Sequence, residues 1–279
     1  MITRFEIAIR PASDWAVLPA DHGYQVKGLV YGWLKAGDAA VSARIHEGAK
    51  TATHKGSGPN PFSCSHVLGL SPPQDGVALV TRHRLYTLRV TSLNAAAGRA
   101  LERGMERAGS HVKLAGVPFD VAGMRIASQT DYGELMRTPQ AEAWVVRFLS
   151  PTSFTTSTAA NREMPVLLPL PYFIFQSLAL RWNAFAPDDV PHVSREFVRM
   201  MQDHVCVTRL ANVWTAPNDA PPEARGFVGE VELRLMAQLE QADFVLMCAL
   251  LRYAPYAGIG GRTSDGRGLV EAEALPEPA

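Results

Sequence analysis

The chain opens with an alternation of apolar and polar positions. Residues 2–10, ITRFEIAIR, place an apolar side chain at every second position, which is typical of a half-buried strand. Residues 22–35 then carry apolar side chains three and four residues apart, which predicts a helix. Gly37 breaks this helix, and Asp38 can cap a short second helix that we expect to end at Gly48.

The rest of the first half alternates between extended and helical patterns. Two strands are expected on either side of the turn SPPQDG, followed by a helix and a further extended stretch; their residues are 61–70, 77–90, 93–109 and 112–128. The order is therefore β-α-β-β-α-β, which is the ferredoxin-like plan.

The same order of elements recurs in the second half. A strand is expected from residue 143 to Ser150, where Pro151 ends it because proline cannot donate to a ladder. A helix with its prolines in the first turn follows over residues 168–185, and a second helical stretch over 194–203. Two strands come next, over 205–214 and 227–236. The half ends with a helix over 243–252 and a last strand over 268–275.

This repetition predicts an α+β protein of two tandem ferredoxin-like (RRM-like, βαββαβ) domains. We assign residues 1–130 to the first domain and 140–279 to the second, with the boundary near SQTDYGELMRTPQ. The length of 279 residues is enough for two cores, and 47% hydrophobic with 19% charged residues is typical of a globular protein.

Cysteine usage and the first residues favour a cytoplasmic location. The three cysteines are far apart with no Cys-x-x-Cys pair, so neither a disulfide framework nor a thiolate metal site is indicated. The first residues lack the apolar block of a signal peptide, and no apolar stretch is long enough to span a bilayer without interruption. We predict no metal and no cofactor.

Charge is balanced overall but uneven along the chain. Twenty-seven basic and twenty-seven acidic residues give no formal net charge. Residues 82–113 carry seven basic residues and two acids, whereas residues 188–243 carry ten acids and five arginines. The cationic region can hold a nucleic-acid backbone. Charge alone supports this interpretation and an ordinary solvent-exposed surface equally well.

The segment GIGGRTSDGRG, residues 258–268, is the richest in glycine. An ordinary turn does not need five glycines, and glycines with flanking arginines can hold a phosphate against bare backbone, so we favour phosphate contact over a plain turn. The segment lacks the Gly-Lys-Ser/Thr of a P-loop, and it follows a helix and precedes a strand, which is the reverse of a dinucleotide-binding loop.

Gly258-Ile-Gly260, followed after five residues by Gly266-Arg267-Gly268, resembles the carboxy-terminal glycine-rich loop of the RAMP (repeat-associated mysterious protein) superfamily of CRISPR systems. RFLSPTSF followed by PLPYFIFQSLALRWN resembles, more narrowly, the CRISPR-associated endoribonucleases that process precursor CRISPR RNA. The family usually carries a hydrophobic residue where Arg267 stands, and often another where Asp265 stands. The resemblance implies tandem ferredoxin-like domains over nearly the whole chain.

The resemblance also implies metal-independent cleavage of repeat RNA. The 2′-hydroxyl beside the scissile phosphate loses a proton, negative charge collects at phosphorus, and the departing 5′-oxygen gains a proton. The family places its catalytic histidine where His46 stands, and some members combine it with a tyrosine and a lysine, which here are Tyr31 and Lys50. The products expected are a 2′,3′-cyclic phosphate and a 5′-hydroxyl.

Further residues are candidates for holding the RNA. His54, in a polar glycine-containing loop, is an alternate base, and His83 between two arginines can meet RNA or face solvent. Four other histidines, His66, His111, His192 and His204, have no partner recognisable from sequence. The candidate RNA-binding set is Gly258, Gly260, Gly261, Arg262, Gly266, Arg267, Gly268, His54, Lys55, Arg82 and Arg84.

The partners expected are precursor CRISPR RNA, other subunits of a CRISPR effector complex and a second copy of the chain. Two other classes of protein remain open. A catalytically inactive RNA-binding subunit of such a complex would keep the loop and the basic strands, and a structural or small-ligand ferredoxin-like protein would show no salt-sensitive RNA binding.

Overall fold

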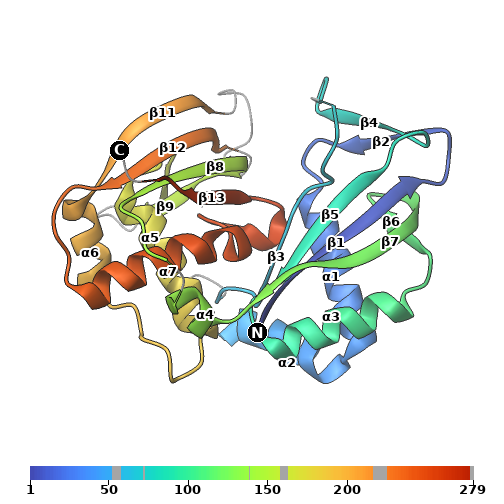
Figure 1. The fold of residues 1–279 in the computed structure, drawn as a ribbon. Coiled ribbons are helices and arrows are strands. Elements are labelled where there is room, and N and C mark those ends of the chain that lie inside the picture. The colour runs from blue at the N-terminus through green and yellow to red at the C-terminus, as the bar shows by residue number, and fades with distance from the viewer. Residues whose placement is uncertain (52–57, 72, 138, 158–162, 216–224, 277–279) are drawn as a thin grey trace. The chain divides into compact units, whose positions relative to one another are not determined.

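The computed structural model describes the chain except for residues 52–57, 72, 138, 158–162, 216–224 and 277–279 (Figure 1). It divides into two compact units. Unit 1 comprises Met1–Thr130 together with Ser264–Gly266, and unit 2 comprises Asp131–Thr263 and Arg267–Ala279. The tip of the glycine-rich segment is thus part of unit 1, although its flanks are part of unit 2.

Unit 1 is built on an antiparallel sheet in the order β3-β5-β1-β7-β6. Its strands are β1 (Ile2–Pro11), β3 (Phe62–Cys64), β5 (Tyr86–Ser92), β6 (His111–Leu114) and β7 (Val117–Thr130). Helices α1 (Gly23–Gly37) and α3 (Ala95–Arg107) cover one face of the sheet, and α2 (Ala39–Thr51) follows α1 (Figure 1). The alternating residues of β1, Phe5, Ile7 and Ile9, are buried in the core as predicted.

The two core helices of unit 1 approach each other through glycine. A Cβ at Gly37 would lie 1.8 Å from the carbonyl oxygen of Ala100, and a Cβ at Gly104 would lie 1.8 Å from that of Trp33. Only the absence of a side chain at these positions allows this contact. Asp38 caps α2 as expected, because its Oδ1 accepts from the amides of Ala40 and Val41 at 3.1 Å.

Unit 2 is built on a four-stranded antiparallel sheet in the order β11-β12-β8-β13. The strands are β8 (Ala143–Thr152), β11 (Val205–Thr215), β12 (Phe227–Leu235) and β13 (Val270–Ala274). Four helices accompany them: α4 (Tyr132–Arg137), α5 (Pro171–Phe185), α6 (Arg195–His204) and α7 (Gln241–Ala257). The fully buried rings of Trp182, Tyr253, Phe175 and Phe227 lie in its core.

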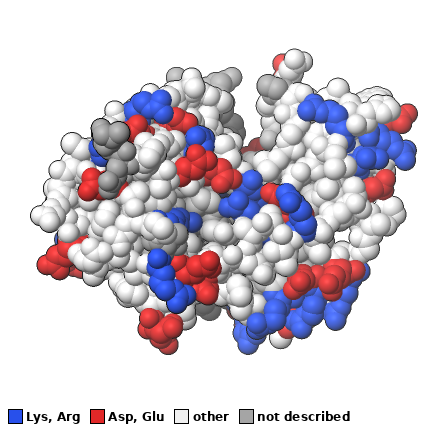
Figure 2. Space-filling model, in the orientation of Figure 1, with Lys and Arg blue, Asp and Glu red and all other residues white. Residues whose placement is uncertain are grey.

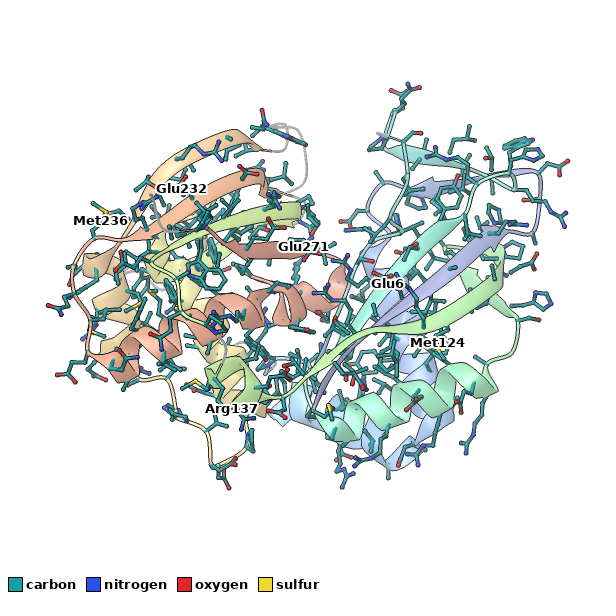
Figure 3. All side chains as sticks on the ribbon, in the orientation of Figure 1. Glu6, Met124, Arg137, Glu232, Met236 and Glu271 are labelled. Carbon is teal, nitrogen blue, oxygen red and sulfur yellow. The ribbon has the colours of Figure 1, made fainter. Side chains whose placement is uncertain are left out.

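The other face of this sheet carries a ladder of ion pairs. Arg147 pairs with Glu230 at 3.0 Å and with Glu273 at 2.9 Å, and Arg209 pairs with Glu230 and Glu232. Glu232 is labelled on β12 in Figure 3, and Figure 2 shows basic and acidic side chains interspersed rather than gathered by sign. These arginines are neutralised by neighbouring carboxylates, so the acidic excess predicted for residues 188–243 is partly compensated within the sheet.

Several sequence expectations were wrong in detail. Residues 77–90 form two strands instead of one: β4 (Val77–Thr81) pairs with the unexpected β2 (Trp15–Pro19), and a turn precedes β5. His83 therefore lies in a turn. Helix α2 does not stop at Gly48 but continues to Thr51, so His46 lies inside the helix and not at its end.

Strand β8 also departs from its prediction, because it continues through Pro151 to Thr152. The ladder between β8 and β12 shifts register between Phe227 and Gly229, and Pro151 lies opposite this irregularity. A proline is tolerated there because no ladder hydrogen bond needs its missing amide. The hairpin of β9 (Phe154–Ser157) and β10 (Glu163–Val166) was not expected at all. In the described part of the chain, no helix is long and apolar enough to cross a bilayer.

Candidate active site

Helix α1 presents Lys27 and Tyr31 on one face, because residues four apart in a helix lie one above the other. Tyr31 is half-buried and its ring packs edge-on against Phe62, with ring centroids 5.4 Å apart. Burial, with the charge of Asp265, raises the pKa of the Tyr31 hydroxyl above its ordinary value. Tyr31 is therefore a neutral phenol at neutral pH and a hydrogen-bond donor rather than a base.

His46 on α2 lies beside this phenol. The two rings meet edge to face, with centroids 5.9 Å apart and an interplanar angle of 89°. The imidazole is exposed to solvent, so one side of the ring is held by Tyr31 while the other is open to a substrate. Imidazole is a side chain that can serve as either acid or base in proton transfer.

A chain of hydrogen bonds leads from Tyr31 to the tip of the glycine-rich segment, all within unit 1. The Tyr31 hydroxyl donates to Asn60 Oδ1 at 2.8 Å, and Asn60 Nδ2 donates to Ser264 Oγ at 3.0 Å. The Cys64 thiol donates to the carbonyl of Ser264 at 2.9 Å, and burial raises its pKa to about 12, so it is not a reactive thiolate. The tip is thereby fixed against the elements that carry Tyr31.

An ion pair reinforces this arrangement. Lys27 Nζ lies 2.8 Å from Asp265 Oδ1, and Gly23 on α1 lies so close to the Asp265 carbonyl that an added Cβ would be 1.7 Å from its oxygen. Gly266, with φ of +83°, packs on the ring of His66. Asp265, which stands where the resembled family often carries a hydrophobic residue, is thus accommodated by a cation on α1.

The glycines on the flanks of the segment pack within unit 2. Gly268 has φ of +64°, and a Cβ there would lie 2.0 Å from the carbonyl oxygen of Ile259. The amide of Gly260 donates to Ser177 Oγ and that of Gly261 to the carbonyl of Ser153. Close packing and a positive φ therefore account for glycine at positions 260 and 268, whereas a Cβ at Gly261 would make only an ordinary contact, 3.7 Å from the carbonyl oxygen of Ser153.

Exposure separates the predicted RNA-binding residues of this segment into two groups. Gly261 and Arg262 are exposed, whereas Gly258, Gly260, Gly266, Arg267 and Gly268 are buried. Arg267 is only 5% exposed, which fits a position that is hydrophobic in the resembled family. Direct contact with a ligand from this segment is consequently easiest at Gly261 and Arg262.

Two of the other predicted RNA-binding residues are exposed in a turn of unit 1. Arg82 and Arg84 are exposed in the turn between β4 and β5, where Arg82 donates to the carbonyl of Ala12 at 3.1 Å and Arg84 to Ser71 Oγ at 3.4 Å. Lys50 lies within α2, but its side chain is outside the described part of the structure. His54 and Lys55 lie outside the described residues altogether.

Sequence reasoning missed Lys27, Asn60, Ser264 and Asp265, and it missed the partners of three histidines. His66 Nε2 lies 3.2 Å from Asp21 Oδ1, His111 Nδ1 lies 2.9 Å from Asp120 Oδ1, and His204 is hydrogen-bonded to the carbonyl of Met200. The spacing of Lys27 and Tyr31 on one helix was the one local signal. Among the described residues, no group of three His, Cys, Asp or Glu side chains could hold a metal ion.

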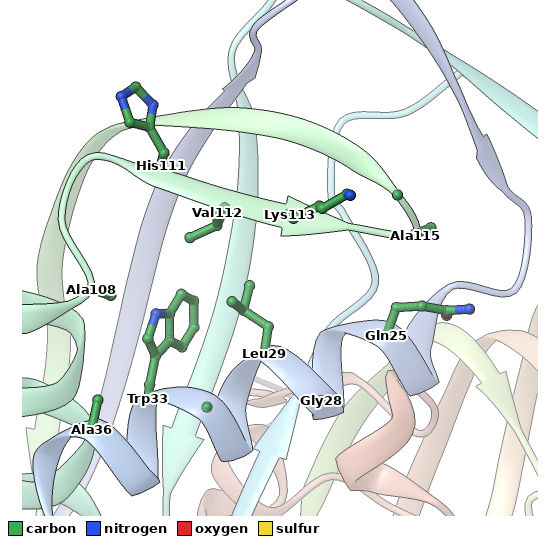
Figure 4. Close-up of a pocket in the computed structure, with 12 residues that line it drawn as sticks. Gln25, Gly28, Leu29, Trp33, Ala36, Ala108, His111, Val112, Lys113 and Ala115 are labelled. Atoms are coloured by element: carbon green, nitrogen blue, oxygen red, sulfur yellow. The ribbon is translucent and has the colours of Figure 1, made fainter.

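A cavity of about 610 Å³ lies against a different part of α1 and does not include Tyr31 or His46 (Figure 4). Its floor is made by Gly28, Gly32 and Ala36 at four-residue spacing, and Trp33 and Val112 form part of its wall. This cavity is therefore separate from the candidate active site.

One family model matches part of the chain. Residues 146–270 match the family model of the CRISPR-associated endoribonuclease Cas6. This range includes most of RFLSPTSF, the helix PLPYFIFQSLALRWN and the glycine-rich segment. Among curated proteins, no significant match is found.

Solved structures of Cas6 proteins share the fold over nearly the whole chain. The product complex of Thermus thermophilus Cas6 (TTHB231) has a TM-score of 0.78 and 22% sequence identity, covering 98% of this chain and 100% of that one. The substrate mimic complex of Cas6 (TTHA0078) has a TM-score of 0.67 with 23% identity, covering 98% and 99%. A Cas6-related protein from Pyrococcus furiosus has a TM-score of 0.62 with 14% identity, covering 98% and 99%.

The expected fold class, α+β with the double ferredoxin-like arrangement, is confirmed by these structures. The family model confirms, over residues 146–270, the resemblance to the CRISPR-associated endoribonuclease Cas6 that the sequence predicts, and the solved structures confirm the fold.

Proposed function

We propose that this protein is a CRISPR RNA-processing endoribonuclease that cuts repeat RNA with His46 as its proton-transfer residue and without a metal ion. The observation that carries the proposal is the exposed imidazole of His46 held against the fixed phenol of Tyr31. The match to the Cas6 family supports the substrate class, because the related structures include complexes with a product and a substrate mimic.

The reaction follows from what RNA itself supplies. His46 takes the proton of the 2′-hydroxyl and gives it to the leaving 5′-oxygen, as the 2′-oxygen bonds to phosphorus and the bond from phosphorus to the 5′-oxygen breaks. The products are a 2′,3′-cyclic phosphate and a 5′-hydroxyl, so no water is consumed in this step. Tyr31 orients the imidazole and keeps its own proton, in line with its raised pKa.

The reaction also needs a cation beside the phosphate, where negative charge collects. Lys27 lies one turn before Tyr31 on the same helix, but its charge is paired with Asp265. Lys50 lies on α2 one turn beyond His46, and we retain it as the residue that stabilises the charge collecting at phosphorus. Arg262 and Gly261, the exposed part of the glycine-rich segment, together with Arg82 and Arg84, would hold the RNA backbone.

Incubation with the repeat RNA of the host's own array in EDTA tests this chemistry. We expect full cleavage of the ribose substrate and none of a copy that carries a 2′-deoxy nucleotide at the scissile position. Cleavage of both RNAs would contradict attack by the 2′-hydroxyl, and cleavage that occurs with Mg²⁺ but is lost in EDTA would contradict metal independence. Tight binding without cleavage of either RNA would favour an inactive RNA-binding subunit.

A further inference from the structure

A second cavity of suitable size for a ligand lies wholly within unit 2. It encloses about 670 Å³ between α5, α6, the start of β9 and the backbone of Gly260 and Gly261. Pockets of a few hundred to a thousand cubic ångströms hold ligands of nucleotide size. None of its lining residues belongs to the candidate active site, which contains Tyr31, His46 and Asn60.

The charge of this cavity is positive. Arg181, Arg195 and Arg199 line it, and no Asp or Glu is among its lining residues. Arg195 and Arg199 lie four residues apart at the start of α6 and are exposed, so both guanidinium groups project from one face of that helix. Glu196, next to Arg195 on α6, interacts with both exposed arginines but does not line the cavity, so the three lining cations favour a ligand that carries negative charge.

Arg181 supplies a charge at the bottom of the cavity. It is 6% exposed, and its guanidinium donates to Thr263 Oγ1 at 3.2 Å, to the carbonyl of Ser177 at 2.9 Å and to that of Gly260 at 2.6 Å. All of these acceptors are neutral, and within the described part of the chain no carboxylate forms an ion pair with it. Burial lowers the pKa of Arg181 to about 10, so it stays charged at neutral pH. A buried charge with neutral partners is stabilised by an anionic ligand.

The walls supply apolar surface next to this charge. Phe173 stacks on Phe154 with ring centroids 5.6 Å apart, and Tyr172 is held by a 3.3 Å hydrogen bond from Gln176. Leu180 is 59% exposed although it lines the cavity. An exposed aliphatic side chain beside ordered aromatic rings is a surface on which the face of a nucleobase can pack.

We propose that this cavity binds one unpaired nucleotide of an RNA strand, with its phosphate toward the arginines and its base against the wall formed by Tyr172, Phe173 and Leu180. This inference rests on the proposed function, because it assumes that the ligand is RNA. The nucleotide must be unpaired, since a base in a duplex is stacked on both faces and cannot reach an apolar wall. The cavity would thus bind single-stranded RNA at a position away from the scissile bond.

Binding of a fluorescein-labelled decauridylate, measured by fluorescence anisotropy, tests the inference. Replacing both exposed arginines (Arg195→Ala with Arg199→Ala) should weaken binding roughly tenfold and lower the slope of log affinity against log salt concentration by about one to two. Gln176→Glu, which adds a negative charge with little change in shape, should also weaken binding. Arg137→Ala, which removes an exposed arginine of unit 2 outside the cavity, is the matched control and should bind as the unaltered protein does.

The base contact is tested separately from the charge. Leu180→Ser should weaken binding of the decauridylate about threefold and leave binding of an abasic ribose-phosphate decamer unchanged. A blunt RNA duplex of the same length should be insensitive to all of these substitutions. Unchanged decauridylate affinity in the double arginine variant, or an equal loss for the duplex, would overturn the inference.

Failure of this inference is distinguishable from failure of the proposed function. If the protein cleaves repeat RNA but the cavity variants bind and cleave normally, only the cavity assignment is wrong. If the cavity variants lose affinity for the decauridylate but no RNA is cleaved, the cavity assignment stands and the assigned chemistry is wrong.

Discussion

The ammonium group of Lys27 on α1 lies 2.8 Å from the carboxylate of Asp265 at the tip of the glycine-rich segment. The pair is mostly buried, with side chains 24% and 21% exposed. Asp265 is next to Ser264, which completes the hydrogen-bond chain to Tyr31. The ion pair therefore connects the position of a residue near the end of the sequence to the candidate active site.

Breaking this pair should reduce cleavage without removing a reacting group. Asp265→Asn and Lys27→Met should each lower the rate of repeat cleavage several-fold and the free energy of unfolding by about 1 kcal/mol. The double variant should lose less than the sum of the two single losses, which a double-mutant cycle measures. Strict additivity would contradict a functional link between the two side chains.

The hydroxyl and the ring of Tyr31 can be separated experimentally. Tyr31→Phe keeps the edge contact with His46 but removes the hydrogen bond to Asn60, so single-turnover cleavage should fall modestly, by about threefold to tenfold. Tyr31→Ala removes both and should cost at least ten times more than Tyr31→Phe. Equal effects of the two substitutions would contradict a positioning role for the ring.

Gly268 should be indispensable to the fold of unit 2. Gly268→Ala places a Cβ 2.0 Å from a carbonyl oxygen at φ of +64°, so we expect a loss of at least about 2 kcal/mol in unfolding free energy, seen as a lower melting temperature. Gly28→Ala on α1 is the control, because a Cβ there meets nothing within 4 Å and alanine favours helix. A melting temperature unchanged by Gly268→Ala would show that the segment packs differently.

Stability should fall in mildly acidic solution because of His22. Burial, with the neighbouring charge of His66, lowers the pKa of His22 from 6.5 to about 4. The neutral imidazole, which accepts from the amide of Val67, is favoured in the folded state, so the unfolded chain binds the proton more readily between these values. The contribution is complete above pH 6.5 and decreases as the pH falls through the window from 6.5 to 4.

Urea unfolding measures this dependence. The contribution of His22 to the free energy of unfolding should change by about 3 kcal/mol over the whole window, and about 2 kcal/mol of this should be lost between pH 7 and pH 5. A His22→Asn variant should be less stable at pH 7 and show a shallower dependence, whereas His111→Gln, at an exposed site, should keep the slope of the unaltered protein. Equal slopes in all three proteins would contradict the assignment to His22.

Local patterns predicted most of the elements that pack on a core. The strand at residues 2–10 and the helix at residues 22–35 were correct because their apolar periodicity reflects burial on one face. The split of residues 77–90 was missed because β4 pairs with β2 in a separate sheet, and only that long-range pairing distinguishes it from β5. Pro151 was misread because a register shift in a partner strand leaves no mark in local sequence.

In the candidate site too, some residues could be identified from the sequence, whereas others depend on contacts that only the fold creates. His46 and Tyr31 were identified through a resemblance, and the structure brings their rings together. Asn60 and Ser264 could not be identified, because a hydrogen bond between residues 204 positions apart depends on the fold and has no spacing of its own. The glycines were interpreted as ligand-binding, whereas at Gly268 steric contact within unit 2 is already sufficient reason for glycine.

The role of His46 is the central claim, and single-turnover cleavage of the host repeat RNA in EDTA tests it most directly. His46→Ala should slow cleavage by roughly a hundredfold to ten-thousandfold while RNA affinity changes less than about threefold. His83→Ala, at another exposed histidine of unit 1, should cleave at the unaltered rate. Cleavage by His46→Ala at the rate of the unaltered protein would contradict the account.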